Sequence, residues 1–105
     1  MKTENPRTFG ETTRNLRKQR GEPLRVVAAA VEIDSTLLSK IERGERFPTE
    51  AQIAKFAEYF GIPQEELAAK AIADRIVSEY GHQSATLQAI KIVKEHMASY
   101  SGEHE

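Results

Sequence analysis

The sequence lacks cysteine and has no long apolar run, and each absence excludes a class of protein. Without cysteine, the chain cannot hold a disulfide framework or a thiolate metal site. No apolar run approaches the roughly 20 residues that a membrane-spanning helix needs. Residues 1–6 also lack the apolar core of a signal peptide. We therefore expect a cytoplasmic protein with no membrane partner.

Residues suited to catalysis or metal binding are also scarce. The three histidines, His82, His96 and His104, lie in a predicted break, on a terminal helix and in the tail. Glu95 and His96 are adjacent, so on a helix they point in different directions and cannot form an i, i+4 metal pair. There is no glycine-rich phosphate loop and no nucleophile elbow. We expect neither an enzyme nor a bound metal or cofactor.

Charge is unevenly divided along the chain, although the formal net charge is only -1. Residues 7–46 contain nine Lys and Arg against six Asp and Glu, whereas residues 63–105 contain four against seven. The front part is therefore basic and the back part acidic. This asymmetry favours contact with DNA by the first part and a different task for the second.

Apolar residues recur at helical spacing, and short breaks separate six predicted helices with no strand pattern. The first helix is predicted to begin around Asn5 and Pro6, a capping residue followed by a first-turn proline. We expect helices at about residues 7–19, 24–31, 35–43, 50–60, 64–80 and 85–100, followed by a disordered tail over 101–105. The second helix is apolar almost all round, which predicts burial on most sides. The fold class is therefore all-α.

The segment from Asp34 to Gly44 predicts a short capped helix. Asp34 can cap its first turn, and Gly44 can end it with a positive φ. One side of this helix is apolar, with Leu37, Leu38 and Ile41. The other side carries small donors and a cation, Ser35, Thr36, Ser39 and Lys40, which suits contact with nucleic acid. With the preceding helix it forms a helix-turn-helix candidate, although a generic helical hairpin or a merely solvated face produces a similar pattern.

From Phe9 to Leu67 the sequence resembles the Cro/XRE-type, phage-repressor-like family of helix-turn-helix regulators. Its most specific feature is the run from Ser39 to Gly44, Ser-Lys-Ile-Glu-Arg-Gly, after an alanine-centred helix. The other matching residues are Phe9-Gly10, Arg14, Leu16-Arg17, Val27-Ala28, Leu38, Pro48, Ile53, Phe56, Gly61-Ile62 and Glu66-Leu67. The resemblance implies a five-helix repressor-like DNA-binding domain over residues 1–68, extended by a C-terminal helix within residues 69–105.

The resemblance also implies residue roles on double-stranded DNA. Base contacts are expected from Ser35, Thr36, Ser39 and Lys40, since hydroxyls bond several base edges and lysine reaches guanine O6 or N7. Phosphate contacts are expected from Arg43 and Arg46 and, more weakly, from Arg14, Lys18 and Arg25. Arg17 and Glu42 are expected to form a structural salt bridge that fixes two helices.

Three positions depart from the family pattern. Leu24 stands where glutamine often touches a phosphate, so this interaction is either missing or moved to Arg25. Glu32 replaces the usual turn glycine, which predicts an altered or strained turn. Thr13 occupies a position that is usually apolar. These departures put the phosphate contacts in doubt but do not break the fold.

The extension carries an apolar stripe that we expect to form a homodimer. A single helix-turn-helix unit binds one half-site, so two units are needed on a palindromic operator. The stripe consists of Ile76, Tyr80, Leu87, Ile90, Val93, Met97 and Tyr100. It can alternatively pack only within its own chain. The extension is too short for a metabolite-binding domain, so a small-molecule ligand is not expected.

The expected function is therefore transcription regulation, as a repressor or an activator. The alternative is a protein-interaction module, such as an antitoxin-like or antagonist protein, whose helix-turn-helix does not read DNA. Changing Lys40 and Arg43 to alanine distinguishes the two interpretations.

Overall fold

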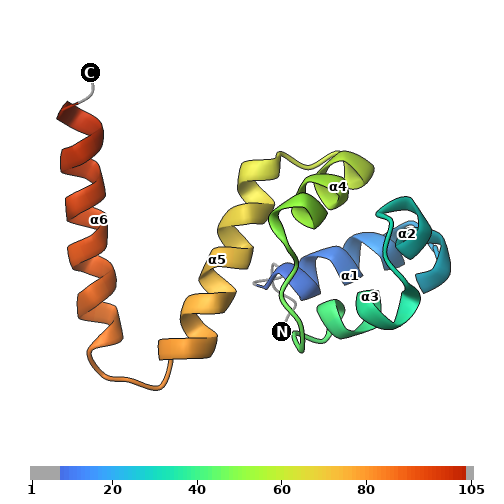
Figure 1. The fold of residues 1–105 in the computed structure, drawn as a ribbon, viewed down its shortest axis with the longest axis horizontal. Coiled ribbons are helices and arrows are strands. Elements are labelled where there is room, and N and C mark those ends of the chain that lie inside the picture. Colours follow the sequence, from blue (N-terminus) through green and yellow to red (C-terminus); the bar gives the residue numbers. More distant parts are fainter. Residues whose placement is uncertain (1–7, 104–105) are drawn as a thin grey trace. The chain divides into compact units, whose positions relative to one another are not determined.

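The protein is all-helical over the part of the chain that the structure, a computed structural model, describes (Figure 1). This part comprises residues 8–103, with side chains for residues 8–100. The helices are α1 (Phe9–Gln19), α2 (Leu24–Ala30), α3 (Ser35–Glu42), α4 (Glu50–Phe60), α5 (Gln64–Tyr80) and α6 (Thr86–Glu103). The predicted all-α fold with a C-terminal helix is confirmed. Contacts divide the chain into two compact units, which meet within α5 between Arg75 and Ile76.

Capping boxes begin α1 and α4. Thr8 accepts a hydrogen bond from the Glu11 backbone N–H at 2.9 Å, and the Glu11 carboxylate accepts one from Thr8 N–H in return. The predicted start at about residue 7 is therefore wrong, because Thr8 is extended and Phe9 is the first helical residue. The proposed cap at residues 5–6 lies outside the described residues. At α4, Thr49 and Gln52 form the same kind of box, with bonds of 2.9 and 3.1 Å.

Two predictions about the helices need correction: the residue at which α6 ends and the number of sides on which α2 is buried. α6 continues to Glu103, so residues 101–103 of the predicted disordered tail are helical, while 104–105 lie outside the described part. A single interior glycine costs a helix only about 1 kcal/mol, so Gly102 does not end it.

In α2, only Val27 and Ala28 are buried, and its other alanines are exposed. A seven-residue helix at the edge of the unit needs only one covered face.

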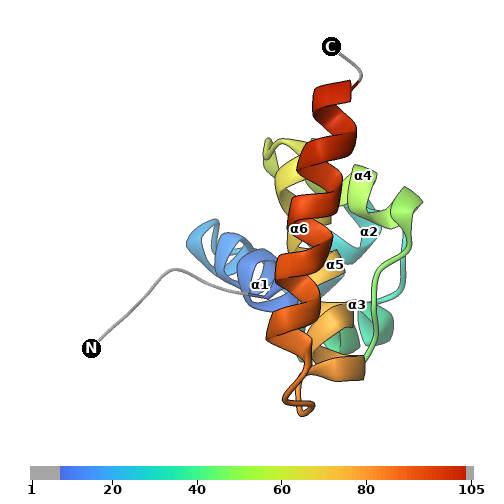
Figure 2. The ribbon, with the colours of Figure 1, turned by 90° about the vertical axis from the view of Figure 1, so that its left-hand side faces the viewer.

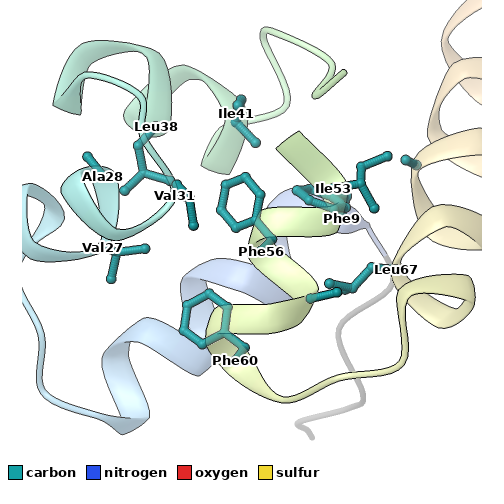
Figure 3. Close-up of a cluster of buried hydrophobic side chains, with 12 residues drawn as sticks. Phe9, Val27, Ala28, Val31, Leu38, Ile41, Ile53, Phe56, Phe60 and Leu67 are labelled. Atoms are coloured by element: carbon teal, nitrogen blue, oxygen red, sulfur yellow. The ribbon is translucent and has the colours of Figure 1, made fainter. Parts of the chain in front are cut away.

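The core of the first unit surrounds two phenylalanines, as Figure 3 shows. Phe9 and Phe56 are at most 1% exposed and meet edge to face, with ring centroids 5.1 Å apart. Burying a side chain of this size contributes about 1.5–3 kcal/mol. The same cluster contains Val27, Ala28, Val31, Leu38, Ile41, Ile53, Ala57, Phe60, Leu67 and Ala71. Because Leu38 and Ile41 belong to it, the core also fixes which side of α3 faces outward.

Thr13 shows how the core accepts a polar residue at a normally apolar position. Its side chain is 1% exposed, and its hydroxyl donates to the carbonyl oxygens of Phe9 and Gly10 at 3.1 and 3.2 Å. The hydroxyl is thus satisfied within α1 itself, which removes most of the desolvation cost.

Close contact between α1 and α3 depends on Gly10 (Figure 1). A Cβ built on Gly10 would lie 2.4 Å from the Ile41 carbonyl oxygen and 2.6 Å from that of Glu42. Such distances are inside van der Waals contact, so any side chain at this position forces the helices apart. Contacts join α1 directly to α3, and Figure 2 shows the ribbon turned by 90°.

Two polar contacts that the sequence did not reveal fasten the first unit. Asp74 of α5 accepts a hydrogen bond from the Phe9 N–H at 2.9 Å, so α5 holds the start of α1. At the other end of α1, Glu22 accepts from the Tyr59 hydroxyl at 2.8 Å, and the Arg20 guanidinium lies 4.7 Å from the Tyr59 ring centroid. These partners are 65 and 37 residues apart in sequence, which is why no local pattern indicates them.

Candidate nucleic-acid interface

Both ends of α3 are fixed by backbone chemistry. The Asp34 carboxylate accepts from the Leu37 N–H at 2.7 Å, as its capping role predicts. At the other end, Gly44 has a φ of 79°, its N–H donates to Ile41 O at 3.0 Å, and Glu45 N–H donates to Lys40 O at 2.8 Å. This pair of bonds is a Schellman motif, which closes the last carbonyls of the helix. The expected glycine stop is therefore present.

The outward side of α3 carries the four residues expected to contact bases. Ser35, Ser39 and Lys40 are half-buried and Thr36 is exposed. Leu38 and Ile41 point into the core at 0% and 1% exposure. Since side chains three and four apart share a face, the four polar residues form one continuous surface.

A buried ion pair sets the orientation of α3 against α1. Arg17 Nε and Nη2 donate to the two carboxylate oxygens of Glu42 at 2.7 and 3.0 Å, and Arg17 Nη1 donates to the Glu22 carbonyl at 3.0 Å. Only 12% and 5% of the two side chains are exposed. The hydrogen bonds to Glu42 raise the pKa of Arg17, while its desolvation lowers it. A two-pronged pair of this kind permits one relative position of the two helices.

The turn between α2 and α3 has the altered backbone expected at Glu32, which has a φ of 64° without being glycine. Its carboxylate lies 3.2 Å from Lys55 Nζ at the surface. At the start of α2, Leu24 packs against the core and the N-cap residue, Pro23, makes no side-chain capping bond. Leu24 thus has a packing role, and the exposed cation beside it is Arg25.

The five cations expected to contact phosphates are all exposed, but one of them already forms hydrogen bonds within the protein. Arg14, Lys18, Arg25 and Arg46 are exposed on α1, on α2 and after α3. Arg43, by contrast, donates to both carboxylate oxygens of Glu45, at 2.8 and 3.2 Å, and also to the Ser39 hydroxyl. The sequence pattern did not distinguish Arg43 from Arg46.

The first unit also contains a hollow of about 400 Å³ that no residue of α3 lines. Its lining residues are Ala30, Glu32, Lys55, Glu58 and Tyr59. It is polar, and its Glu32 and Lys55 are paired with each other. Within the described residues, no group of three His, Cys, Asp or Glu side chains is placed to hold a metal ion. Over the same part of the chain, no helix has the length and hydropathy to cross a membrane.

The second unit has an apolar groove and no buried core among its described side chains. The groove, of about 410 Å³, is lined chiefly by Ile76, Tyr80, Ala85, Ala89, Ile90 and Val93. Met97 and Tyr100 continue the stripe along α6, at 64% and 60% exposure. Leu87 is 80% exposed. All seven residues predicted for dimerisation therefore present apolar surface on α5 or α6.

Comparison with known proteins agrees with this geometry. Residues 8–69, more than half of the chain, match the model of a family described as a helix-turn-helix domain. A solved structure, that of the clp gene regulator ClgR from Corynebacterium glutamicum, has a similar fold, with a TM-score of 0.54 and 22% identity. The likeness covers 91% of this chain and 92% of that one. No curated protein matches the sequence.

Proposed function

Because the chain belongs to the helix-turn-helix domain family, we propose that it is a transcription regulator that binds double-stranded DNA through α3. The observation that carries the proposal is the continuous outward surface of Ser35, Thr36, Ser39 and Lys40 on a helix whose other side is locked into the core. A helix held in this way can enter the major groove as a rigid body, because its caps and the Arg17–Glu42 pair leave it no freedom to rotate.

The residue types on this surface suit the reading of base edges. Ser35, Thr36 and Ser39 carry hydroxyls, which donate to or accept from the groove edges of bases. Lys40 is the one cation among them, and its ammonium group can reach O6 or N7 of guanine. A good contact of this kind discriminates between bases by about 1–3 kcal/mol.

The exposed cations position the protein on DNA by contacting backbone phosphates. They are Arg14, Lys18, Arg25 and Arg46. Contacts with phosphates fix the register of the protein but carry no sequence information. These four cations make eight such contacts in a dimer, which gives a log–log slope of binding against salt of about -7, at roughly -0.9 per contact. Arg43 differs from these four because Glu45 occupies its guanidinium.

The experiment that tests this function is selection of bound sequences from a random DNA pool, followed by titration over a range of salt. The expected result is a palindromic site whose half-sites are separated by about 10 base pairs or a multiple, with a slope of about -7. A pool with no enriched sequence, together with a salt-insensitive complex, would overturn the proposal. That outcome would favour a protein-interaction module of the antitoxin-like or antagonist kind.

The protein acts as a homodimer in this proposal, joined through the second unit. Helices shorter than about 12–15 residues are marginal in water, and longer ones still depend on a covered apolar face. α6 exposes 53% of Val93 and 43% of Ile90, and the described side chains of its own unit do not cover them. A second copy of the same surface, related by a two-fold axis, supplies the missing cover and places two α3 helices on one DNA molecule.

α6 offers a matched pair of variants for this test. Val93 lies on the stripe and Ile92 lies about 100° away around the helix, yet the two are similarly exposed at 53% and 57%. Val93→Glu should convert the dimer to a monomer in sedimentation experiments, while Ile92→Glu should leave it dimeric. Equal effects, or a wild-type monomer, would contradict the assignment of the stripe.

Binding of the dimer to DNA near a promoter would block or recruit polymerase, and repression is the simpler of these two outcomes.

A further inference from the structure

The end of α3 places a carboxylate directly beside the cation that follows the helix. The Schellman motif at Gly44 turns the backbone, so Glu45 faces back toward Arg43. Arg43 Nε and Nη2 donate to Glu45 Oε2 and Oε1 at 2.8 and 3.2 Å, a two-pronged arrangement. The third nitrogen, Nη1, donates to the hydroxyl of Ser39. Arg43 therefore bridges the turn and the outward surface of α3.

This bridge leaves Arg43 poorly suited to phosphate. The hydrogen bonds from Arg43 to Glu45 raise the pKa of Arg43 and lower the pKa of Glu45. Both groups therefore stay ionised around neutral pH, and their charges cancel. A DNA phosphate would have to displace Glu45 before it gained a two-pronged contact with the guanidinium. Arg46 is exposed three residues further along, and its charge is directed to the DNA backbone in the proposed complex.

The same bridge determines what Ser39 can offer to a base. A serine hydroxyl has one proton to donate and two lone pairs to accept with. Arg43 occupies a lone pair, so the proton is directed away from the guanidinium. The guanidinium N–H hydrogens beside Ser39 are partly positive even though Glu45 cancels the net charge, so they repel the amino hydrogens of adenine N6 and cytosine N4. Ser39 is left as a donor, and the neighbouring Arg43 N–H groups favour acceptors as well.

Building on the proposed function, we propose that Arg43 is a positioning residue for sequence reading: held by Glu45, it fixes Ser39 as a hydrogen-bond donor and so selects guanine in each half-site. Guanine presents two acceptors, O6 and N7, and no donor in the major groove. Adenine and cytosine present an amino donor there, and thymine presents one acceptor beside a methyl group. The guanine specified in this way lies opposite Ser39, in addition to any base that Lys40 reads.

The test compares the sequences selected by wild type, Ser39→Ala, Arg43→Ala and Arg46→Ala, with the salt dependence of each. Ser39→Ala and Arg43→Ala should both lose the preference for the same guanine, and Arg43→Ala should leave the salt slope unchanged. Arg46→Ala is the matched control: it removes the same charge three residues away and should keep the base preferences. Its slope should become shallower by roughly 0.9 for each phosphate that the variant no longer neutralises.

Glu45→Gln tests the bridge from its other end. It frees the Arg43 charge, so binding should become stronger and less sequence-dependent, and the salt slope should steepen. Arg43 and Glu45 side chains are each 53% exposed, so the variants should fold, and circular dichroism melts verify this. An Arg43→Ala variant with a shallower slope and unchanged base preferences would overturn the inference and make Arg43 a phosphate contact. A wild-type chain that selects no sequence would overturn the proposed function and this inference with it.

Discussion

Replacing Arg17 by methionine should destabilise the first unit severely, because Glu42 would be left charged inside the protein. The Glu42 side chain is 5% exposed, and both of its carboxylate oxygens accept hydrogen bonds from Arg17. Removing one partner of a buried pair costs about 3–5 kcal/mol. A unit that ends at Arg75 has a total stability of roughly 4–11 kcal/mol, at about 0.05–0.15 kcal/mol per residue. Arg17→Met should therefore consume a large share of it.

The double variant Arg17→Met, Glu42→Met separates the charge from the packing. Two apolar side chains of similar volume often replace a buried ion pair at little cost, so the double variant should lie within about 2 kcal/mol of wild type. Part of that difference comes from the Glu22 carbonyl, which loses the Arg17 Nη1 bond. Urea unfolding followed by circular dichroism measures Arg17→Met, Glu42→Met and the double variant. If Arg17→Met cost less than about 1 kcal/mol, as for an exposed pair, or if the single losses simply added, the reasoning would be refuted.

Three further variants test contacts within the first unit. Glu32→Gly should raise stability by about 1 kcal/mol in thermal unfolding, since it relieves a φ of 64° at the loss of one surface ion pair; a loss of stability would show that the turn is unstrained. Gly10→Ala should cost about 3 kcal/mol or more, because its Cβ meets the Ile41 carbonyl oxygen at 2.4 Å, and a neutral effect in urea unfolding would contradict the contact. Burial raises the pKa of Asp74, the hydrogen bond from Phe9 N–H lowers it, and the nearby charge of Glu11 raises it further. The net shift is upward, so the folded state binds a proton more tightly than the unfolded state. As pH falls from 7 through the folded-state pKa, wild type should therefore gain stability relative to Asp74→Asn, and a constant difference between the two would contradict this.

Local signals in the sequence were enough to predict much of the fold. The spacing of apolar residues and the cap at Asp34 predict the positions of the helices, with α5 predicted to the residue. The resemblance carried by residues 9–67 is confirmed by the family match to residues 8–69. The altered turn expected at Glu32 is present as well, because this turn requires a left-handed residue whatever side chain stands there.

What the sequence did not reveal depends on contacts between distant residues or on side-chain geometry. Asp74 reaches the Phe9 N–H across 65 residues, and no local pattern marks such a pair. The start of α1 was misplaced because Asn5-Pro6 and Thr8 are both good capping signals, and only the structure distinguishes them. The sequence did not separate Arg43 from other basic residues near α3, because its bridge to Ser39 and Glu45 depends on the turn at Gly44. The roles of these residues on DNA, and the homodimer, stay predictions.

The most direct test of DNA reading by α3 is a titration of the selected duplex, followed by fluorescence anisotropy, with wild type and Lys40→Ala. Lys40 lies on the outward surface of α3, whereas Lys55 on α4 pairs with Glu32 and provides a control of equal charge. Lys40→Ala should weaken binding by roughly tenfold or more, from a contact of about 1–3 kcal/mol in each half-site, and Lys55→Ala should bind as wild type does. If Lys40→Ala bound the duplex with wild-type affinity, α3 would not be the element that reads DNA.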